Sequence, residues 1–452
     1  MTYAPHTPDE RAEMLSRIGV ANIEALFTDV PASARFPQLN LPPALSEPEA
    51  LRELYSLAAS NGHAADMPIF LGAGAYYHFI PSHVSQLLLR GEFLTAYTPY
   101  QPEVSQGTLQ VIYEYQSMMS LLTGMDVSNA SHYDGGTSLA EGVIMALNIH
   151  RRKRTRVVLS PGIHPMYREI ARTYTPGLNV EYVGDDNPHH TLSDLLALTD
   201  HNTAILFVQY PNFFGDIEDL TGLADALHAK GALLGVVTNP LTLGLLRPPG
   251  DFGADIVLGE AQPLGIPLSY GGPYLGFFAT RTEYVRKMAG RLAGETLDRD
   301  GKRGFVLTLT PREQHIRREK ATSNICTNQG LMATAATIYL ATLGKHGLRQ
   351  VAELCYHRAH YAAEQIAALD GFEVVNPGPF FHEFVVRCPV PVKEINDELY
   401  DHYDIIGGYD LSADYPHLQN CMLIAVTEMN SREDIDNFVA ALKEIAGGNH
   451  HG

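Results

Sequence analysis

The polar and aromatic stretch at residues 97–107 contains residue types that could take part in chemistry. It reads YTPYQPEVSQG, with two tyrosines and two prolines in its first six residues. Proline restricts the backbone, so a loop of this composition holds ligand-facing groups with little loss of entropy. The candidate functional side chains are those of Tyr97, Tyr100, Gln101, Glu103, Ser105 and Gln106. A structural turn has a similar composition, so the residues alone leave both interpretations open.

A second candidate is the run of small residues YDGGTS at 133–138, which leads into a predicted helix. Free backbone N–H groups at a helix start attract anions, so Asp134, Gly135, Gly136 and Thr137 form a candidate anion cup. A plain helix cap at Asp134 or Thr137 accounts for the same residues equally well.

A third candidate is the segment REKATSNICTNQ at 318–329, which joins two predicted domains. Its hydrogen-bonding side chains include Ser323, Asn324 and Thr327. A hinge that lines a cleft has this composition, and so does an ordinary helix start capped at Thr327.

Several common catalytic motifs are absent from the sequence. It has no GxxxxGK[ST] phosphate loop, no GxGxxG between a strand and a helix, no GxSxG elbow and no HExxH zinc helix. The 20 histidines are scattered, and the pair His189 and His190 is typical of a solvated turn. We therefore predict no metal site.

The composition is that of a globular protein with a large core. The 452 residues are 45% hydrophobic and 18% charged, which excludes a disordered, collagen-like or disulfide-scaffold chain. The 32 basic and 51 acidic residues give a net charge of −19, so nucleic acid is not an expected partner. No two of the four cysteines form a CxxC pair, and we find no signal peptide and no membrane-spanning stretch. We expect a cytoplasmic protein.

The pattern of elements predicts an α/β fold with a large, mostly parallel, doubly wound domain. Apolar runs predict strands at 156–160, 180–183, 204–209, 233–238, 255–258 and 274–280. Helical stretches are predicted before and between them at 106–123, at 137 up to the basic run 151–154, at 191–198 and at 219–230.

Three regions are predicted along the chain. Residues 1–65 form an N-terminal arm, with a helix at 9–18 and a proline-rich continuation. Residues 66–320 form the large domain, and residues 321–452 form a smaller α+β domain. The expected elements of the small domain are helices at 329–343, 346–369 and 431–445 and strands at 372–375, 383–387 and 422–427.

A further set of short segments identifies a family. RPPGDFGAD at 247–255, GEAQPLGIP at 259–267 and GGP at 271–273, together with the three candidate segments above, resemble the glycine cleavage system P-protein. The resemblance covers nearly the whole chain, from about residue 9 to 445. It is to the half of that protein that lacks the cofactor lysine, which is a separate α subunit in some organisms. The resemblance implies the fold-type-I architecture of enzymes that depend on pyridoxal phosphate (PLP).

The same resemblance bears on the cofactor. An enzyme of this kind needs a lysine for a Schiff base and an aspartate beside the pyridinium nitrogen. Residues 231–286 contain no lysine, and matching the flanking segments places Gln262 at the lysine position. The strand end at 236–240 carries no acidic residue. We therefore expect no covalent cofactor on this chain, a vestigial phosphate cup at 134–137, and PLP on a partner β subunit.

The resemblance also implies an activity and partners. With the β subunit, expected in an α2β2 assembly, the chain would take part in decarboxylating glycine and transferring the aminomethyl group to lipoylated H-protein. Its own contribution would be to shape the active site. Two alternatives are a self-sufficient PLP enzyme that uses Lys287, Lys302 or Lys320, and a structural pseudoenzyme of the same fold.

Overall fold

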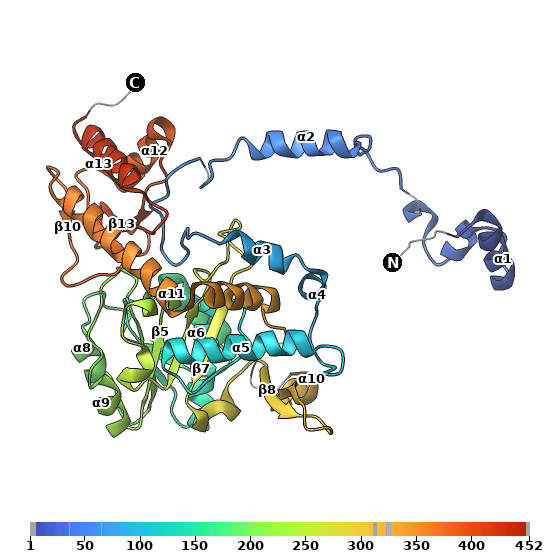
Figure 1. The fold of residues 1–452 in the computed structure, drawn as a ribbon, viewed down its shortest axis with the longest axis horizontal. Coiled ribbons are helices and arrows are strands. Elements are labelled where there is room, and N and C mark those ends of the chain that lie inside the picture. Colours follow the sequence, from blue (N-terminus) through green and yellow to red (C-terminus); the bar gives the residue numbers. More distant parts are fainter. Residues whose placement is uncertain are drawn as a thin grey trace. The chain divides into compact units, whose positions relative to one another are not determined.

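The computed structural model describes residues 6–35, 37–64, 66–310, 314–321, 323, 325 and 327–448 (Figure 1). The chain divides into two compact units, Met1–Gly62 and His63–Gly452. None of the helices that the structure describes is long and apolar enough to cross a membrane.

The first unit consists of short helices that bury no residue. Helix α1 (Pro8–Ile18) starts at a capping box between Thr7 and Glu10, which confirms the predicted helix. The remaining helices are η1 (Ile23–Phe27), η2 (Ala32–Ala34) and α2 (Glu47–Ala58). Because these helices carry apolar side chains that none of them buries, the described residues of this unit form no hydrophobic core.

The second unit is built on a seven-stranded sheet with the order β1-β7-β6-β5-β4-β2-β3. The five strands from β6 to β3 are parallel, whereas β7 is antiparallel to both of its neighbours. The strands are β1 (Val127–Ser128), β2 (Arg156–Leu159), β3 (Glu181–Val183), β4 (Thr203–Gln209), β5 (Leu233–Val237), β6 (Ile256–Glu260) and β7 (Gly276–Thr280). The central strands β5, β6 and β7 are buried along their whole length, as strands covered on both faces must be.

Helices cover both faces of this sheet (Figure 1). One face packs on α5 (Gln106–Thr123), α8 (Leu192–Ala197), α9 (Leu223–Ala229) and the first half of α11 (Gly330–Ala367). The other face packs on α6 (Gly135–Ile149) and α7 (Pro165–Tyr174). This is the predicted doubly wound α/β architecture.

The smaller sheet has the order β10-β11-β13-β12, and all of its strands pair antiparallel. Its strands are β10 (Glu373–Val374), β11 (Glu383–Arg387), β12 (Tyr409–Asp410) and β13 (Cys421–Ala425). They share a second hydrophobic core with the last part of α11, α12 (Val392–Tyr403) and α13 (Arg432–Ala446). The strands predicted at 383–387 and 422–427 and the helix at 431–445 are confirmed.

The two helices predicted at 329–343 and 346–369 are confirmed as the two parts of α11, which is interrupted by non-helical dihedrals at Gly344, between the predicted helices. One feature differs from the sequence-based expectation. The hairpin of β8 (Leu292–Leu297) and β9 (Arg303–Thr308) was not predicted. The remaining helices of this unit are α3 (Ser82–Leu88), α4 (Gly91–Leu94), α10 (Gln314–Arg317) and the 3-10 helices η3 (Pro240–Gly244), η4 (Pro249–Phe252), η5 (Thr282–Lys287) and η7 (Arg318–Lys320).

Candidate functional site

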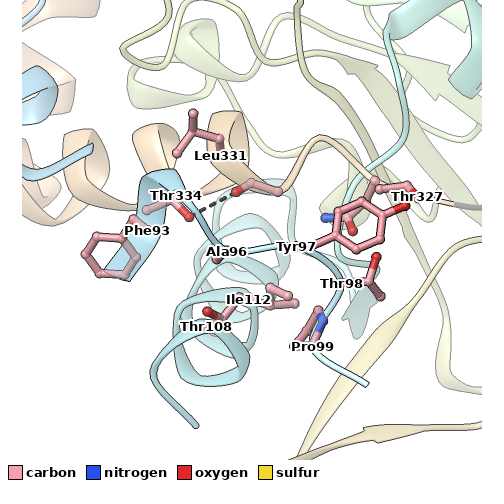
Figure 2. A pocket seen from close by; sticks show the side chains of 12 residues that line it. Phe93, Ala96, Tyr97, Thr98, Pro99, Thr108, Ile112, Thr327, Leu331 and Thr334 are labelled. Atoms are coloured by element: carbon pink, nitrogen blue, oxygen red, sulfur yellow. Dashed lines mark hydrogen bonds between the residues drawn. The ribbon is translucent and has the colours of Figure 1, made fainter. Parts of the chain in front are cut away.

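A cavity of about 120 Å³ lies where the loop after α4 meets the beginnings of α5 and α11 (Figure 2). It brings together two of the candidate segments, because Tyr97 from the loop and Thr327 from the segment 318–329 both line it. The other lining residues are Phe93, Ala96, Thr98, Pro99, Thr108, Ile112, Asn328, Gly330, Leu331 and Thr334. The cavity therefore joins parts of the chain that are more than 200 residues apart in sequence.

The loop is held by side chains at its far end. The Tyr100 hydroxyl accepts a hydrogen bond of 2.7 Å from Arg291 Nη2, and the guanidinium lies 5.2 Å from the centre of the Tyr100 ring. Gln106 Nε2 donates to the carbonyls of Pro102 and Phe305, both at 2.8 Å, and Gln106 Oε1 accepts from Phe305 N–H at 2.8 Å. These bonds tie the loop to Arg291, just before β8, and the start of α5 to β9.

The segment 318–329 is fixed to α6 and to the chain after β1 in the same way. Ser323 Oγ donates to Glu141 Oε1 at 2.8 Å, and Asn328 Nδ2 donates to the Ala130 carbonyl at 3.0 Å. Burial raises the pKa of Glu141 to about 7, and the hydrogen bond from Ser323 works against that rise. The predicted residue Asn324 lies outside the described residues.

The predicted loop residues take different positions. Tyr97 is 77% exposed and lines the cavity, whereas the side chains of Tyr100 and Gln106 serve as anchors. Gln101 and Glu103 are exposed, Ser105 is half-buried, and none of the three lines the cavity. Sequence reasoning missed the anchor Arg291. It also missed the residues of α5 and α11 that line the cavity, because they lie in ordinary amphipathic or apolar helical stretches.

A second, smaller cavity of about 30 Å³ lies near the carboxyl ends of the parallel strands β4, β5 and β6. Ligands of open α/β sheets bind at this edge. The lining residues are Gly74, Tyr76, His164, Tyr167, Gln209, Val237, Thr238, Asn239 and Glu260. His164 stacks on Tyr167 with 4.5 Å between the ring centres, and burial lowers the pKa of His164 to about 4, so this imidazole is neutral at pH 7.

Gln262 lies beside this cavity and is fully engaged with the main chain. Its Nε2 donates to the carbonyls of Tyr76 (3.0 Å) and Ile266 (2.7 Å), and its Oε1 accepts from Tyr76 N–H at 2.9 Å. The side chain is 1% exposed. The Gln262 amide therefore links the main chain of Tyr76 to that of Ile266.

Glu260 is bound by three main-chain N–H groups. Its Oε2 accepts from Gly135 N–H at 3.0 Å, and its Oε1 accepts from Gln262 N–H at 2.9 Å and Leu275 N–H at 2.8 Å. Burial raises the pKa of Glu260 to about 7, although these hydrogen bonds work against the rise. Asp134 caps α6 through a 2.7 Å bond from Thr137 N–H to its Oδ1.

These residues do not fit PLP on this chain. No lysine is among the described residues that line the small cavity, and its volume is far below the ~300–1,000 Å³ of typical ligand pockets. The Gly135 N–H in the first turn of α6 already donates to the Glu260 carboxyl group, so it is not available to a cofactor phosphate.

One other cluster has metal-ligand chemistry. Ligand atoms of His78, Cys355 and Glu428 lie within 4.8 Å of one another. Glu428 accepts hydrogen bonds from Phe79 N–H (2.8 Å) and Cys355 Sγ (3.2 Å) and pairs with His78 Nδ1 at 2.7 Å. Burial opposes ionisation of Glu428, but His78 and the hydrogen bonds outweigh it and lower its pKa to about 2. The cluster thus ties the segment before α3 to α11 as a hydrogen-bonded unit.

The sequence and the structure of this chain match those of known proteins. Residues 1–442 match the family model of the glycine cleavage system P-protein. A protein of Thermomicrobium roseum named "Probable glycine dehydrogenase (decarboxylating) subunit 1" is 58% identical, over 98% of this chain and 99% of that protein. The crystal structure of a glycine decarboxylase (P-protein) of the glycine cleavage system, in inhibitor-bound form, is 42% identical, with a TM-score of 0.90 over 98% of this chain and 100% of that one.

A more distant structure shows the fold alone. Glutamate decarboxylase of Lactobacillus brevis has a TM-score of 0.67 and 13% identity, over 93% of this chain and 98% of that one. The architecture is that of the fold-type-I PLP-dependent enzymes, and this chain belongs to the glycine cleavage system P-protein family.

Proposed function

We propose that this chain is the α subunit, or subunit 1, of a glycine decarboxylase and that it acts with a β subunit that carries PLP. Support comes from the relatives named subunit 1, which match this chain over nearly their whole length. A protein named as one subunit of an enzyme implies a second. The proposed assembly is α2β2, and the proposed acceptor of the aminomethyl group is lipoylated H-protein.

The observation that carries the proposal is the state of Gln262. The resemblance places this residue where the lysine-bearing half has its lysine, and an amide cannot form a Schiff base. The hydrogen bonds of its side-chain amide run to the main chain of Tyr76 and Ile266, so the residue is built into the scaffold.

The non-standard lysines are poorly placed for the alternative of a self-sufficient PLP enzyme. Lys287, Lys302 and Lys320 are all exposed, and among the described residues neither cavity is lined by a lysine. A Schiff-base lysine is usually desolvated so that its amine is neutral near pH 7. Exposed lysines lack that environment.

The contribution of this chain is then to complete the partner's pocket. When bound on the partner, PLP supplies an electron sink for the decarboxylation of glycine. Tyr97 offers a hydroxyl and an exposed aromatic face, and Thr327 offers a second hydroxyl at the same cavity. We propose that these side chains orient the substrate and exclude water, while Tyr100 and Gln106 hold the loop in place.

Reconstitution tests the proposal. This chain, a lysine-bearing partner subunit and lipoylated H-protein would be mixed, and glycine-dependent exchange of labelled CO2 would be measured. We expect exchange only when both subunits are present. Full exchange by the partner and H-protein without this chain would contradict the proposal.

A further inference from the structure

The carboxyl group of Glu260 occupies a position where a bound anion would be expected. It lies at the start of the 15-residue helix α6, next to the N–H of Gly135, the first helical residue. N–H groups at a helix start, with the positive end of the helix dipole, favour negative charge. In this chain the Glu260 carboxyl group takes the place of a bound anion.

All three hydrogen-bonded neighbours of this carboxyl group are donors, and they come from different segments. Gly135 begins α6, Gln262 follows β6, and Leu275 precedes β7. Glu260 itself is 7% exposed. Three converging N–H groups need a hydrogen-bond acceptor between them, because a buried N–H without a partner is destabilising.

Bulky side chains fill the space beside the same helix turn. A Cβ atom at Gly135 would lie 2.5 Å from the Tyr167 hydroxyl, and one at Gly136 would lie 2.4 Å from Ile170 Cδ1. The adjoining cavity of about 30 Å³ has room for one or two water molecules. A phosphorylated aromatic ring does not fit there.

We infer that Glu260 is an internal substitute for a ligand phosphate and closes the ancestral cofactor site of this chain against phosphate-bearing ligands. The inference rests on the proposed function for the idea that the chain needs no cofactor of its own. It goes further, because it explains exclusion of a non-covalently bound ligand, which the loss of a lysine does not.

Replacing Glu260 should open this site to small anions. Removing the carboxyl group in Glu260→Ala leaves the N–H groups of Gly135, Gln262 and Leu275 without their acceptor and opens space next to them. Inorganic phosphate should then bind the variant and stabilise it, because a ligand that binds only the folded state raises its melting temperature.

The experiment measures melting temperatures of the full chain at pH 8 in inorganic phosphate and in chloride of equal ionic strength. We expect Glu260→Ala to melt at least 5 °C below the parent chain in chloride and to regain at least half of that loss, saturably, in phosphate. The parent chain and two controls should show no such gain. Glu260→Gln keeps the volume of the site. Glu141→Ala removes a different buried carboxyl group, which lies on α6 and accepts a hydrogen bond from Ser323.

A second readout uses the parent chain and does not depend on the variant's folding. Pyridoxamine 5′-phosphate has no aldehyde, so it cannot label surface lysines. We expect no saturable binding of this probe by the parent chain in equilibrium dialysis.

Three results would overturn the inference: stoichiometric binding of the probe to the parent chain, an equal response of Glu260→Ala to chloride and phosphate, or a Glu260→Ala chain that stays unfolded in both salts. Failure of the proposed function shows up elsewhere, as absent CO2 exchange in the reconstituted complex.

Discussion

At the scale of single residues, Tyr97 and Gln106 belong to one candidate segment, residues 97–107, but make different contacts. Tyr97 is 77% exposed at the edge of the larger cavity, whereas the Gln106 amide makes three hydrogen bonds to the main chain. A side chain that acts on substrate and one that holds the scaffold should respond differently to substitution. This contrast allows two matched predictions.

Tyr97→Phe should lower glycine-dependent CO2 exchange by the reconstituted complex about tenfold to a hundredfold, the loss of one positioning hydrogen bond of ~1–3 kcal/mol. The melting temperature should stay within 1 °C of the parent chain, because the ring remains and the hydroxyl belongs to an exposed side chain. Unchanged exchange per assembled complex would remove Tyr97 from the site.

Gln106→Ala should instead lower the free energy of unfolding by about 2 kcal/mol, because the main-chain N–H and carbonyl of Phe305 both lose their hydrogen bond to the Gln106 amide. The matched control is Gln101→Ala, an exposed residue of the same loop, with an expected effect within ~0.5 kcal/mol. Chemical denaturation measures both. Equal effects of the two substitutions would show that Gln106 is not an anchor.

The buried carboxyl of Glu141 predicts a pH effect. Its pKa, raised from 4.5 to about 7 by burial, means that the folded chain binds this proton more tightly than the unfolded chain. The stability that it contributes is therefore present below pH 4.5 and is lost as the pH rises to about 7. Glu141→Gln cannot ionise, so it should gain up to ~3 kcal/mol relative to the parent chain between pH 5 and pH 8. Parallel stability curves would contradict this.

At the scale of elements, the contact between the large sheet's loops and the smaller sheet depends on a glycine. Gly215 has φ of +92°, and a Cβ atom there would lie 1.9 Å from the Glu383 carbonyl oxygen in β11. Gly215→Ala should therefore cost more than ~2 kcal/mol. Gly177→Ala, with nothing within 4 Å and no positive φ, should change stability by less than ~0.5 kcal/mol. Similar melting temperatures for the two variants would be inconsistent with a tight contact.

The elements that could be predicted from sequence are those with local signals. The apolar runs of β4, β5 and β6 predict buried strands because each run is short and continuous. The hairpin β8–β9 lacked such a signal, because the second half of β8 is exposed and includes Glu295 and Thr296, and β9 is only partly buried. The break in α11 is at Gly344, within the gap between the two predicted helices.

The candidate site was less accessible to sequence reasoning. The loop and the segment 318–329 could be singled out by composition, but their meeting at one cavity depends on tertiary contacts. The bond between Gly135 and Glu260 spans 125 positions, and that between Tyr76 and Gln262 spans 186. Neither pairing leaves a periodic or spacing signal, so the carboxylate at the start of α6 could be found only in the structure.

At the scale of the whole molecule, the unit Met1–Gly62 has many exposed apolar side chains. Leu39, Leu41 and Tyr55 are 70%, 71% and 72% exposed, and the helices of this unit bury no residue. Exposed apolar surface of this extent is typical of a protein interface. We propose that the arm binds the β subunit.

Deletion of residues 1–62 tests the arm. We expect the melting temperature of the remaining chain to change by less than 2 °C, because its hydrophobic cores are formed by residues after 63. Binding to the β subunit, measured by calorimetry, should weaken at least a hundredfold. Full affinity of the shortened chain would exclude the arm from the interface.

We propose that the partner, and not this chain, carries the cofactor of the complex. The most direct test reduces the PLP-loaded complex with borohydride and maps the pyridoxyl peptides of both subunits by mass spectrometry. We expect one pyridoxyl-lysine per β subunit and only trace labelling of exposed lysines on this chain. A stoichiometric pyridoxyl group on Lys287, Lys302, Lys320 or any other lysine of this chain would contradict it.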